Sequence, residues 1–114
     1  MNNADFSKVV DKQLELCRSL LCKKGKEYDS DTGDRFHSFK VAAALQKETA
    51  MQALAGMLAK HTVSIYDLIH DGSHDLAVWD EKITDHINYL LLLKGLIMDE
   101  IGALECESDK EVEV

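Results

Sequence analysis

The chain contains no proline, and only six glycines occur among its 114 residues. Proline interrupts helices because it lacks a backbone N–H and clashes with the preceding turn, so a chain without it can form long helices. Hydrophobic residues make up 46% of the sequence, which is enough for one core. The alternating β-branched runs that are typical of strands are absent. We therefore expect a single all-α domain.

Apolar residues that recur at steps of three and four predict the helices of this domain. One helix is short and three are long, with expected ranges of Ala4–Lys24, Phe36–Gln46, Lys47–His70 and Asp75–Glu105. The expected architecture is a four-helix bundle over residues 1–105. An acidic and disordered tail is expected at residues 106–114.

Each long helix carries an apolar stripe that we expect to face the core. In chain order, the stripes are Phe6-Val10-Leu14-Cys17-Leu21, Met51-Leu54-Leu58-His61-Ile65-Leu68 and Trp79-Ile83-His86-Leu90-Leu93-Ile97. On the last helix Leu91, Leu92 and Leu96 lie off the stripe, so its second half is apolar around most of its circumference. Because a thin bundle cannot cover such a helix on all sides, we expect a homo-oligomer.

The charge distribution limits the possible partners. The formal net charge is −8, and the last ten residues supply −4 of it through five acids and one lysine. With only two arginines the chain lacks an extended basic surface, so duplex nucleic acid is not an expected partner. The longest apolar run has five residues, which excludes a membrane span, and no signal peptide is recognisable at the N-terminus. We expect a cytoplasmic protein with reduced cysteines.

The segment Gly25–Arg35 is polar and rich in turn-forming residues. Its three aspartates suggest a calcium loop, but an EF-hand loop that starts at Asp29 needs glycine at its sixth position and glutamate at its twelfth. The chain has Asp34 and Lys40 there. The segment is either a solvated connector or a loop that bends over a ligand site.

The candidate site lies on the last helix, where Glu81, Asp85 and Asn88 share one face at spacings of four and three. Two carboxylates one turn apart, with a side-chain amide beside them, can share a Mg²⁺ ion. The alternative interpretation is a solvated acidic face. On the third helix Lys60 and Asp67 lie on one face, and Lys60 either holds a phosphate as a point charge or is solvated.

Four motifs along the chain together resemble small phage and prophage proteins. The motifs are Lys23-Lys24-x-Lys26-Glu27-Tyr28, Asp34-Arg35-x-x-x-Phe39, Leu58-x-Lys60-His61-x-x-Ser64-x-x-Asp67 and Trp79-x-Glu81-Lys82-x-x-Asp85-x-x-Asn88-Tyr89-Leu90. These proteins are distantly similar to the MazG-like all-α nucleoside triphosphate pyrophosphatases and to nucleotide-modification-associated proteins of phages. The resemblance covers residues 20–97.

What the resemblance implies is an oligomeric helical bundle that handles nucleotides. In the MazG-like enzymes, carboxylates from two helices hold Mg²⁺, and the metal and a lysine bind the triphosphate. Carried over, Glu81 and Asp85 match the later acidic pair, and Lys60 the phosphate-binding lysine. The chain has no ExxE pair for the earlier helix. Glu27, Glu48 and Asp67 are the nearby acids that can replace it.

Three hypotheses for the function follow. The first is a Mg²⁺-dependent (d)NTP pyrophosphohydrolase with Glu81 and Asp85 as catalytic metal ligands, completed by Glu27 or Asp67. Lys60, His61 and Asn88 would contact the nucleotide. The second is a protein that binds and sequesters a nucleotide without cleaving it. The third is an oligomeric interaction module that needs no ligand.

Overall fold

The structure is a computed structural model that describes residues 1–27, 33–72 and 75–102, with the backbone alone for residues 25–27. It contains the helices α1 (Asn3–Glu27), α2 (His37–Gln46), α3 (Ala50–Asp71) and α4 (Leu76–Ile101). The described residues form no strand, which confirms the all-α prediction of one short and three long helices. None of these helices is long and apolar enough to cross a membrane.

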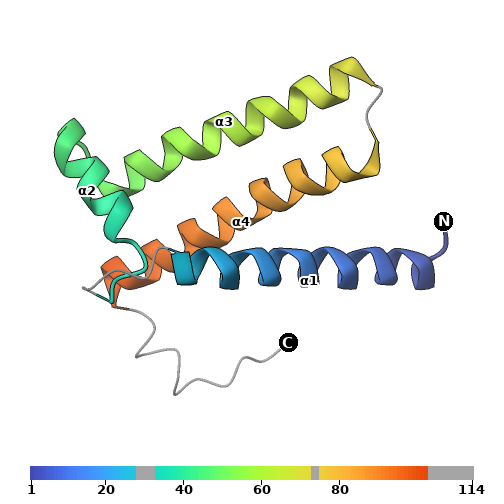
Figure 1. Cartoon of the computed structure of the whole chain (residues 1–114), viewed down its shortest axis with the longest axis horizontal. Coiled ribbons are helices and arrows are strands. Elements are labelled where there is room, and N and C mark those ends of the chain that lie inside the picture. The colour runs from blue at the N-terminus through green and yellow to red at the C-terminus, as the bar shows by residue number, and fades with distance from the viewer. Residues whose placement is uncertain (28–32, 73–74, 103–114) are drawn as a thin grey trace.

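Helix α4 lies between α3 and α1 (Figure 1). Helices α3 and α4 run antiparallel, α1 packs along the other side of α4, and α2 packs across the first turns of α3. Within the described ranges α1 and α3 do not touch each other. The predicted bundle is therefore open. Its three long helices form one layer, in which α4 lies in the middle and α1 and α3 lie on either side of it.

The ends of α2 and α3 are set by local hydrogen bonds. Thr49 forms a capping box with Gln52, whose backbone N–H donates to the Thr49 hydroxyl over 3.1 Å while the Gln52 side chain accepts from the Thr49 N–H. Lys47 adopts a left-handed conformation with φ 56° and ends α2. The predicted start of α3 at Lys47 was therefore wrong by three residues.

Two further helix ends differ from the prediction. Helix α1 continues through Gly25 to Glu27, three residues beyond its predicted end at Lys24. Helix α4 starts after the N-cap Asp75, whose carboxylate accepts the Val78 N–H, but it ends at Ile101 rather than near Glu105. The cause is Gly102, which has a φ of 66° and caps the last carbonyl groups. The predicted tail at residues 106–114 lies outside the described residues, as do residues 28–32 of the predicted connector.

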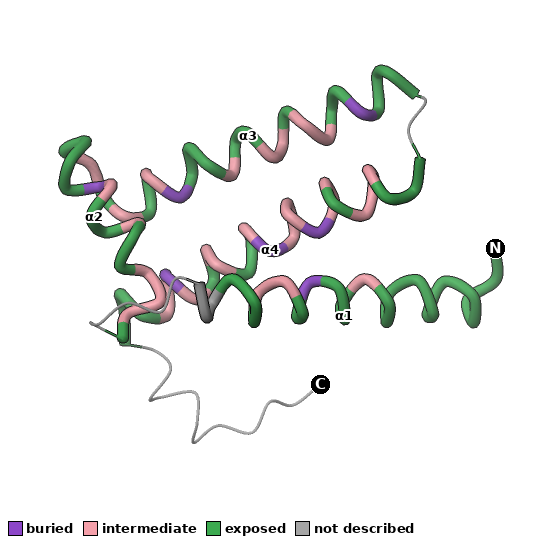
Figure 2. Tube along the Cα trace, in the orientation of Figure 1, coloured by how far each residue is buried: buried purple, intermediate pink, exposed green. Residues whose placement is uncertain are grey.

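Burial confirms the predicted stripe on α3 from Leu54 to Leu68, although Met51 is exposed, and corrects the stripe on α1 (Figure 2). On α3, Leu54 and Leu68 are buried. On α1 only Cys17 is buried, whereas Phe6, Val10 and Leu14 are exposed. Figure 1 gives the reason, because α4 diverges from α1 towards the N-terminal half of α1 and joins α3 instead.

The predicted stripe on α4 is also corrected. Most of its residues are only half-buried, and Leu90 is exposed. The most buried residues are Thr84, Asn88 and Leu96, and the last of these has no exposed surface. They lie on the side that the sequence placed away from the core. Because α4 packs against helices on two sides, a single stripe cannot describe its burial.

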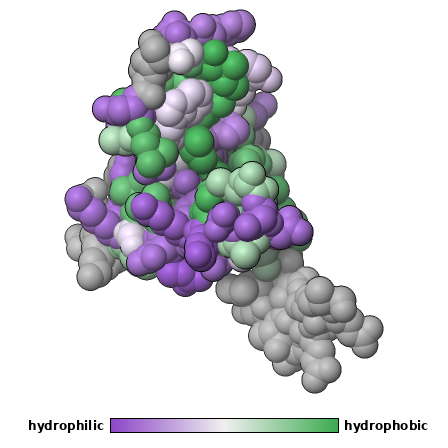
Figure 3. Space-filling view, turned by 90° about the vertical axis from the view of Figure 1, so that its right-hand side faces the viewer, coloured by the Kyte–Doolittle hydropathy of each residue, from purple (hydrophilic) through white to green (hydrophobic). Residues whose placement is uncertain are grey.

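Exposed apolar side chains remain at the end of the molecule where α1 begins and α3 turns into α4. Figure 3 views this end and shows hydrophobic atoms among hydrophilic ones. The large apolar residues that are exposed at this end include Phe6 of α1, Ile69 of α3 and Leu76 of α4. The described chain therefore leaves apolar surface uncovered on both outer helices of the layer.

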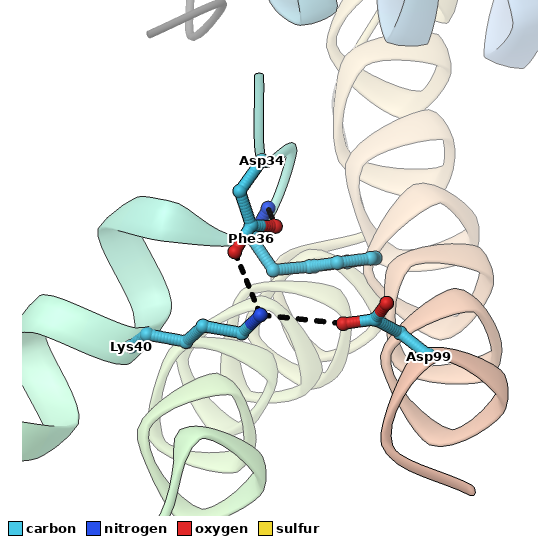
Figure 4. A network of polar contacts seen from close by, with 4 residues as sticks. All are labelled: Asp34, Phe36, Lys40 and Asp99. Carbon is cyan, nitrogen blue, oxygen red and sulfur yellow. Dashed lines mark hydrogen bonds and ion pairs between the residues drawn. The ribbon is translucent and has the colours of Figure 1, made fainter. Parts of the chain in front are cut away.

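The turn before α2 is fixed to α4 by one aromatic and one ionic contact (Figure 4). An added Cβ on Gly95 of α4 would lie 3.0 Å from Cζ of Phe36, so the glycine lets the ring pack against the helix. The Lys40 ammonium group donates to Asp34 over 2.6 Å and to Asp99 over 3.3 Å. The Asp34 carboxylate also accepts the Phe36 N–H over 2.9 Å. Both contacts hold the start of α2 against the last turns of α4.

Three substitutions at two glycines, Gly56 and Gly95, test the contact between Phe36 and Gly95. Gly56→Ala on α3 should raise the free energy of unfolding by about 0.5–1 kcal/mol, because alanine favours a helix and the added Cβ meets nothing within 4 Å. Gly95→Ala should give clearly less stabilisation, because its Cβ must displace Phe36, and Gly95→Val should destabilise. Urea unfolding measures all three changes. Equal gains from the two alanine variants would contradict the packing of Phe36 on Gly95.

The Lys40 contact should depend on pH. Hydrogen bonds from Lys40 and from the Phe36 N–H lower the pKa of Asp34, and Asp34 and then Asp99 raise the pKa of Lys40. The Asp34–Lys40 ion pair therefore stabilises the folded state fully above the ordinary aspartate pKa. This stabilisation is lost as the pH falls through the lowered pKa of Asp34. At the alkaline end it is lost as the pH rises through the raised pKa of Lys40.

Titration of the Asp34 carboxyl carbon by NMR measures this effect. Lys40→Gln should return the Asp34 pKa towards its ordinary value, whereas Lys8→Gln on α1 should leave it low. An unchanged titration in Lys40→Gln would show that the contact does not persist in solution.

Candidate functional site

A cavity of about 290 Å³ lies where the four helices meet. We call it the central cavity. Its wall is formed by Leu20, Leu21 and Lys24 of α1, Arg35, then Ser38, Phe39, Ala42 and Gln46 of α2, Ala53 and Met57 of α3, and Asp85, Asn88, Tyr89 and Leu92 of α4. Such a volume lies at the lower end of the range for small-molecule sites.

Two features of the helices shape this cavity. Several wall residues are small, and others are one turn apart on their helix, so that they face the same side. Ala42 belongs to the alanine-rich part of α2, and Ala53 to the first turns of α3. On α4, Asp85 and Tyr89 are one turn apart, as are Asn88 and Leu92, so both pairs face the same side. The result is a mostly apolar wall that carries a few polar groups.

Asn88 is the most unusual of these groups. The residue is only 5% exposed, and neither its amide nitrogen nor its amide oxygen has a hydrogen-bond partner within the described chain. Leaving a buried polar group unpaired costs about 1–3 kcal/mol. One turn earlier Thr84 is equally buried, but its hydroxyl accepts from the Gln13 side chain over 2.8 Å. The amide of Asn88 therefore has an unmet capacity both to donate and to accept.

Three charged residues line the central cavity. Lys24 comes from α1, Arg35 from the turn before α2, and Asp85 from α4. The Asp34–Lys40–Asp99 network holds the turn that carries Arg35. Two cations and one carboxylate give the wall a net charge of +1, in contrast to the strongly acidic chain. The wall can therefore receive an anionic group.

The two histidines of the predicted core stripes, His61 on α3 and His86 on α4, each contact a residue of the other helix. The His61 ring packs on Tyr89 with ring centroids 4.5 Å apart and an interplanar angle of 32°. The His86 Nε2 and the Thr62 hydroxyl are 2.9 Å apart and share a hydrogen bond. His61 therefore packs on Tyr89, which lines the central cavity, and does not itself line it.

Both members of the predicted acidic pair line a groove between α1 and α4, and one of them also reaches the central cavity. Asp85 lines the central cavity and also a groove between α1 and α4, whereas Glu81 lines only that groove, together with Asp80 and Lys23. Within the described chain, no three His, Cys, Asp or Glu residues are grouped so that they could hold a metal ion. The side chain of Glu27 lies outside the described residues. The Mg²⁺ site stays a prediction.

The other predicted site residues are placed differently. Lys60 and Asp67 are exposed on α3 and line neither hollow. Arg35, Phe39 and Tyr89 do line the central cavity, and the sequence motifs contained them without giving them a role. Lys24 was likewise contained in a motif without a role, and Ser38 was not named in any motif. Of the proposed site residues, the structure thus brings Asp85 and Asn88 together in the central cavity, and Asp85 and Glu81 together in the groove between α1 and α4.

No family model, no curated protein and no solved structure matches this chain.

Proposed function

We propose that this protein binds a nucleotide in the central cavity. The observation that carries the proposal is the buried and unpartnered amide of Asn88. A nucleobase edge presents donors and acceptors side by side, and a carboxamide can pair with such an edge through two hydrogen bonds. A ligand that meets this amide replaces an unpaired buried group by a paired one, which favours binding.

The remainder of the wall fits the same kind of ligand. Phe39 and Tyr89 offer aromatic surface to a planar ring, and base–aromatic stacking is worth about 1–3 kcal/mol. Lys24 and Arg35 offer positive charge to phosphate. The resemblance to nucleotide-handling phage proteins also supports this proposal.

A catalytic version of the proposal is a Mg²⁺-dependent (d)NTP pyrophosphohydrolase. Asp85 would contribute a metal ligand from the cavity wall, Glu81 a second from the next turn, and Glu27 would complete the set. Its support is the resemblance together with the position of Asp85. Binding without cleavage needs only the groups that already line the cavity, so it is the function we favour.

Asn88→Leu separates a ligand-binding role of Asn88 from a structural one. Leucine has a similar size and no unpaired polar atoms, so the variant should unfold at a higher temperature than the wild type. The thermal shift that a nucleotide causes in the wild type should disappear. Differential scanning fluorimetry with a panel of nucleotides measures both effects.

Thr84→Val is the matched control for this experiment. It removes an equally buried polar group that is already paired with Gln13, so it should lower the unfolding temperature and keep the nucleotide shift. Lower stability with an intact nucleotide shift in Asn88→Leu would assign Asn88 a structural role. If no nucleotide stabilises the wild type, the proposed function is wrong. Pyrophosphate release in the presence of Mg²⁺ that is lost in Asp85→Asn would favour the catalytic version.

We also propose that the chain self-associates through the N-terminal half of α1. Phe6, Val10 and Leu14 lie in line with the buried Cys17 on this helix, yet they are exposed. The expectation of a homo-oligomer rested on Leu91, Leu92 and Leu96 of α4. In the structure Leu96 is covered within one chain and Leu92 lines the cavity, whereas Leu91 remains exposed. We place the interface on α1 because three exposed apolar residues lie in line there.

Acidic substitutions in the exposed apolar stripe of α1 should dissociate the oligomer. The double variant Phe6→Glu, Leu14→Glu should sediment as a monomer while its helix content stays unchanged, because both side chains are exposed. Lys8→Glu lies on the opposite side of α1 and serves as the control. Analytical ultracentrifugation compares the masses, and the same mass for the double variant and the wild type would exclude this interface.

A further inference from the structure

We infer that the ligand is a nucleoside monophosphate whose phosphate lies at the N-terminus of α2. This inference rests on the proposed function and deepens it. It assigns the two ends of one cavity, with the base at Asn88 and the phosphate at the start of α2.

The N-terminus of α2 has unused capacity for an anion. The first backbone N–H groups of a helix have no partners within the helix, and the helix dipole adds positive potential there. The two earliest N–H groups are already paired with Asp34. The Phe36 N–H donates to the Asp34 carboxylate over 2.9 Å, and the His37 N–H donates to the Asp34 backbone carbonyl over 3.1 Å. The N-cap residue Phe36 supplies no side-chain cap to the groups that follow. Those groups belong to Ser38 and Phe39, and both residues line the central cavity.

Two cations line the same cavity as this helix end. Arg35 lies two residues before the first residue of α2, and Lys24 belongs to the last turns of α1. Both line the same cavity as Ser38, whose hydroxyl adds a further donor. A guanidinium group, an ammonium group, a hydroxyl and the N-terminus of a helix together are the groups that bind phosphate in proteins.

An independent observation indicates that the cavity holds an organic ligand and not a free anion. The unpartnered amide of Asn88 belongs to the same wall but lies on α4. Inorganic phosphate has only acceptor oxygens and its O–H groups, and it has no apolar surface for Phe39 or Tyr89. A base joined through a sugar to a phosphate uses both kinds of group at once.

Charge and size select the number of phosphates. Lys24 and Arg35 contribute two positive charges and Asp85 one negative charge, a net +1. A phosphate monoester carries about −1.5 to −2 at pH 7, and a triphosphate carries roughly twice that charge. A triphosphate would thus leave several negative charges uncompensated beside Asp85 in the absence of metal. The volume of about 290 Å³ is also at the small end for ligand sites, which favours a mononucleotide.

Isothermal titration calorimetry of the full chain without metal tests this inference. The ligands are nucleosides of each common base with their 5′-monophosphates and 5′-triphosphates, and inorganic phosphate is added as a separate probe. For the preferred base, the monophosphate should bind about tenfold tighter than the nucleoside, as one or two charge-assisted hydrogen bonds provide. The triphosphate should bind no tighter than the monophosphate.

Variants locate the phosphate. Lys24→Gln and Arg35→Gln should each weaken monophosphate binding about threefold, because the whole phosphate contributes about tenfold, and each should leave nucleoside binding unchanged, which also shows that the variants are folded. Lys23→Gln and Arg18→Gln are the matched controls, because these residues do not line the central cavity, and they should change neither affinity.

The possible failures are distinguishable. Equal binding of nucleoside and monophosphate, or unchanged monophosphate binding in both Lys24→Gln and Arg35→Gln, overturns the inference and leaves nucleotide binding in place. A triphosphate that binds much tighter than the monophosphate overturns it as well. Binding of inorganic phosphate alone, or of none of these ligands, overturns the proposed function together with the inference.

Discussion

The packing of α4 between α1 and α3 is the interaction on which the remaining structure depends. The two outer long helices, α1 and α3, do not touch each other within the described chain, so each is held in place by α4. A helix in this position needs two buried sides, and the apolar character of α4 around its circumference supplies them. The sequence pattern that suggested contact with another chain is thus partly explained within one chain.

This arrangement also explains how a polar residue comes to be buried. Asn88 lies on the same side of α4 as Leu92 and Leu96, and that side is closed by neighbouring helices. An aliphatic residue there would pack without an unpaired group. A polar side chain that is retained at a cost of about 1–3 kcal/mol is typical of a binding site, where stability is exchanged for recognition.

The helices could be predicted from the sequence because their signals are local. Periodicity and the missing prolines indicated four helices, and the ends that were misplaced depend on single residues such as Thr49 and Gly102. The buried faces were harder to predict, because they depend on which helices become neighbours. Phe6 and Leu14 match a core stripe by spacing, yet α4 diverges from that half of α1. Asp85 and Asn88 were identified because they interrupt an apolar pattern, whereas Lys24 and Arg35 lie in polar surroundings that give no such contrast.

The position of α1 at the edge of the layer has a consequence for the order of assembly. The α3–α4 pair joins segments that are neighbours in the sequence, whereas α1 must find α4 across a separation such as the 71 residues between Gln13 and Thr84. Contacts between neighbouring segments form first, and distant ones carry a larger loop-closure cost. Docking of α1 is then a late step, and it is also the step that completes the wall of the central cavity with Leu20, Leu21 and Lys24. A transient release of α1 would open this wall while the α3–α4 pair stays folded, which gives a ligand a route of entry that needs no global unfolding.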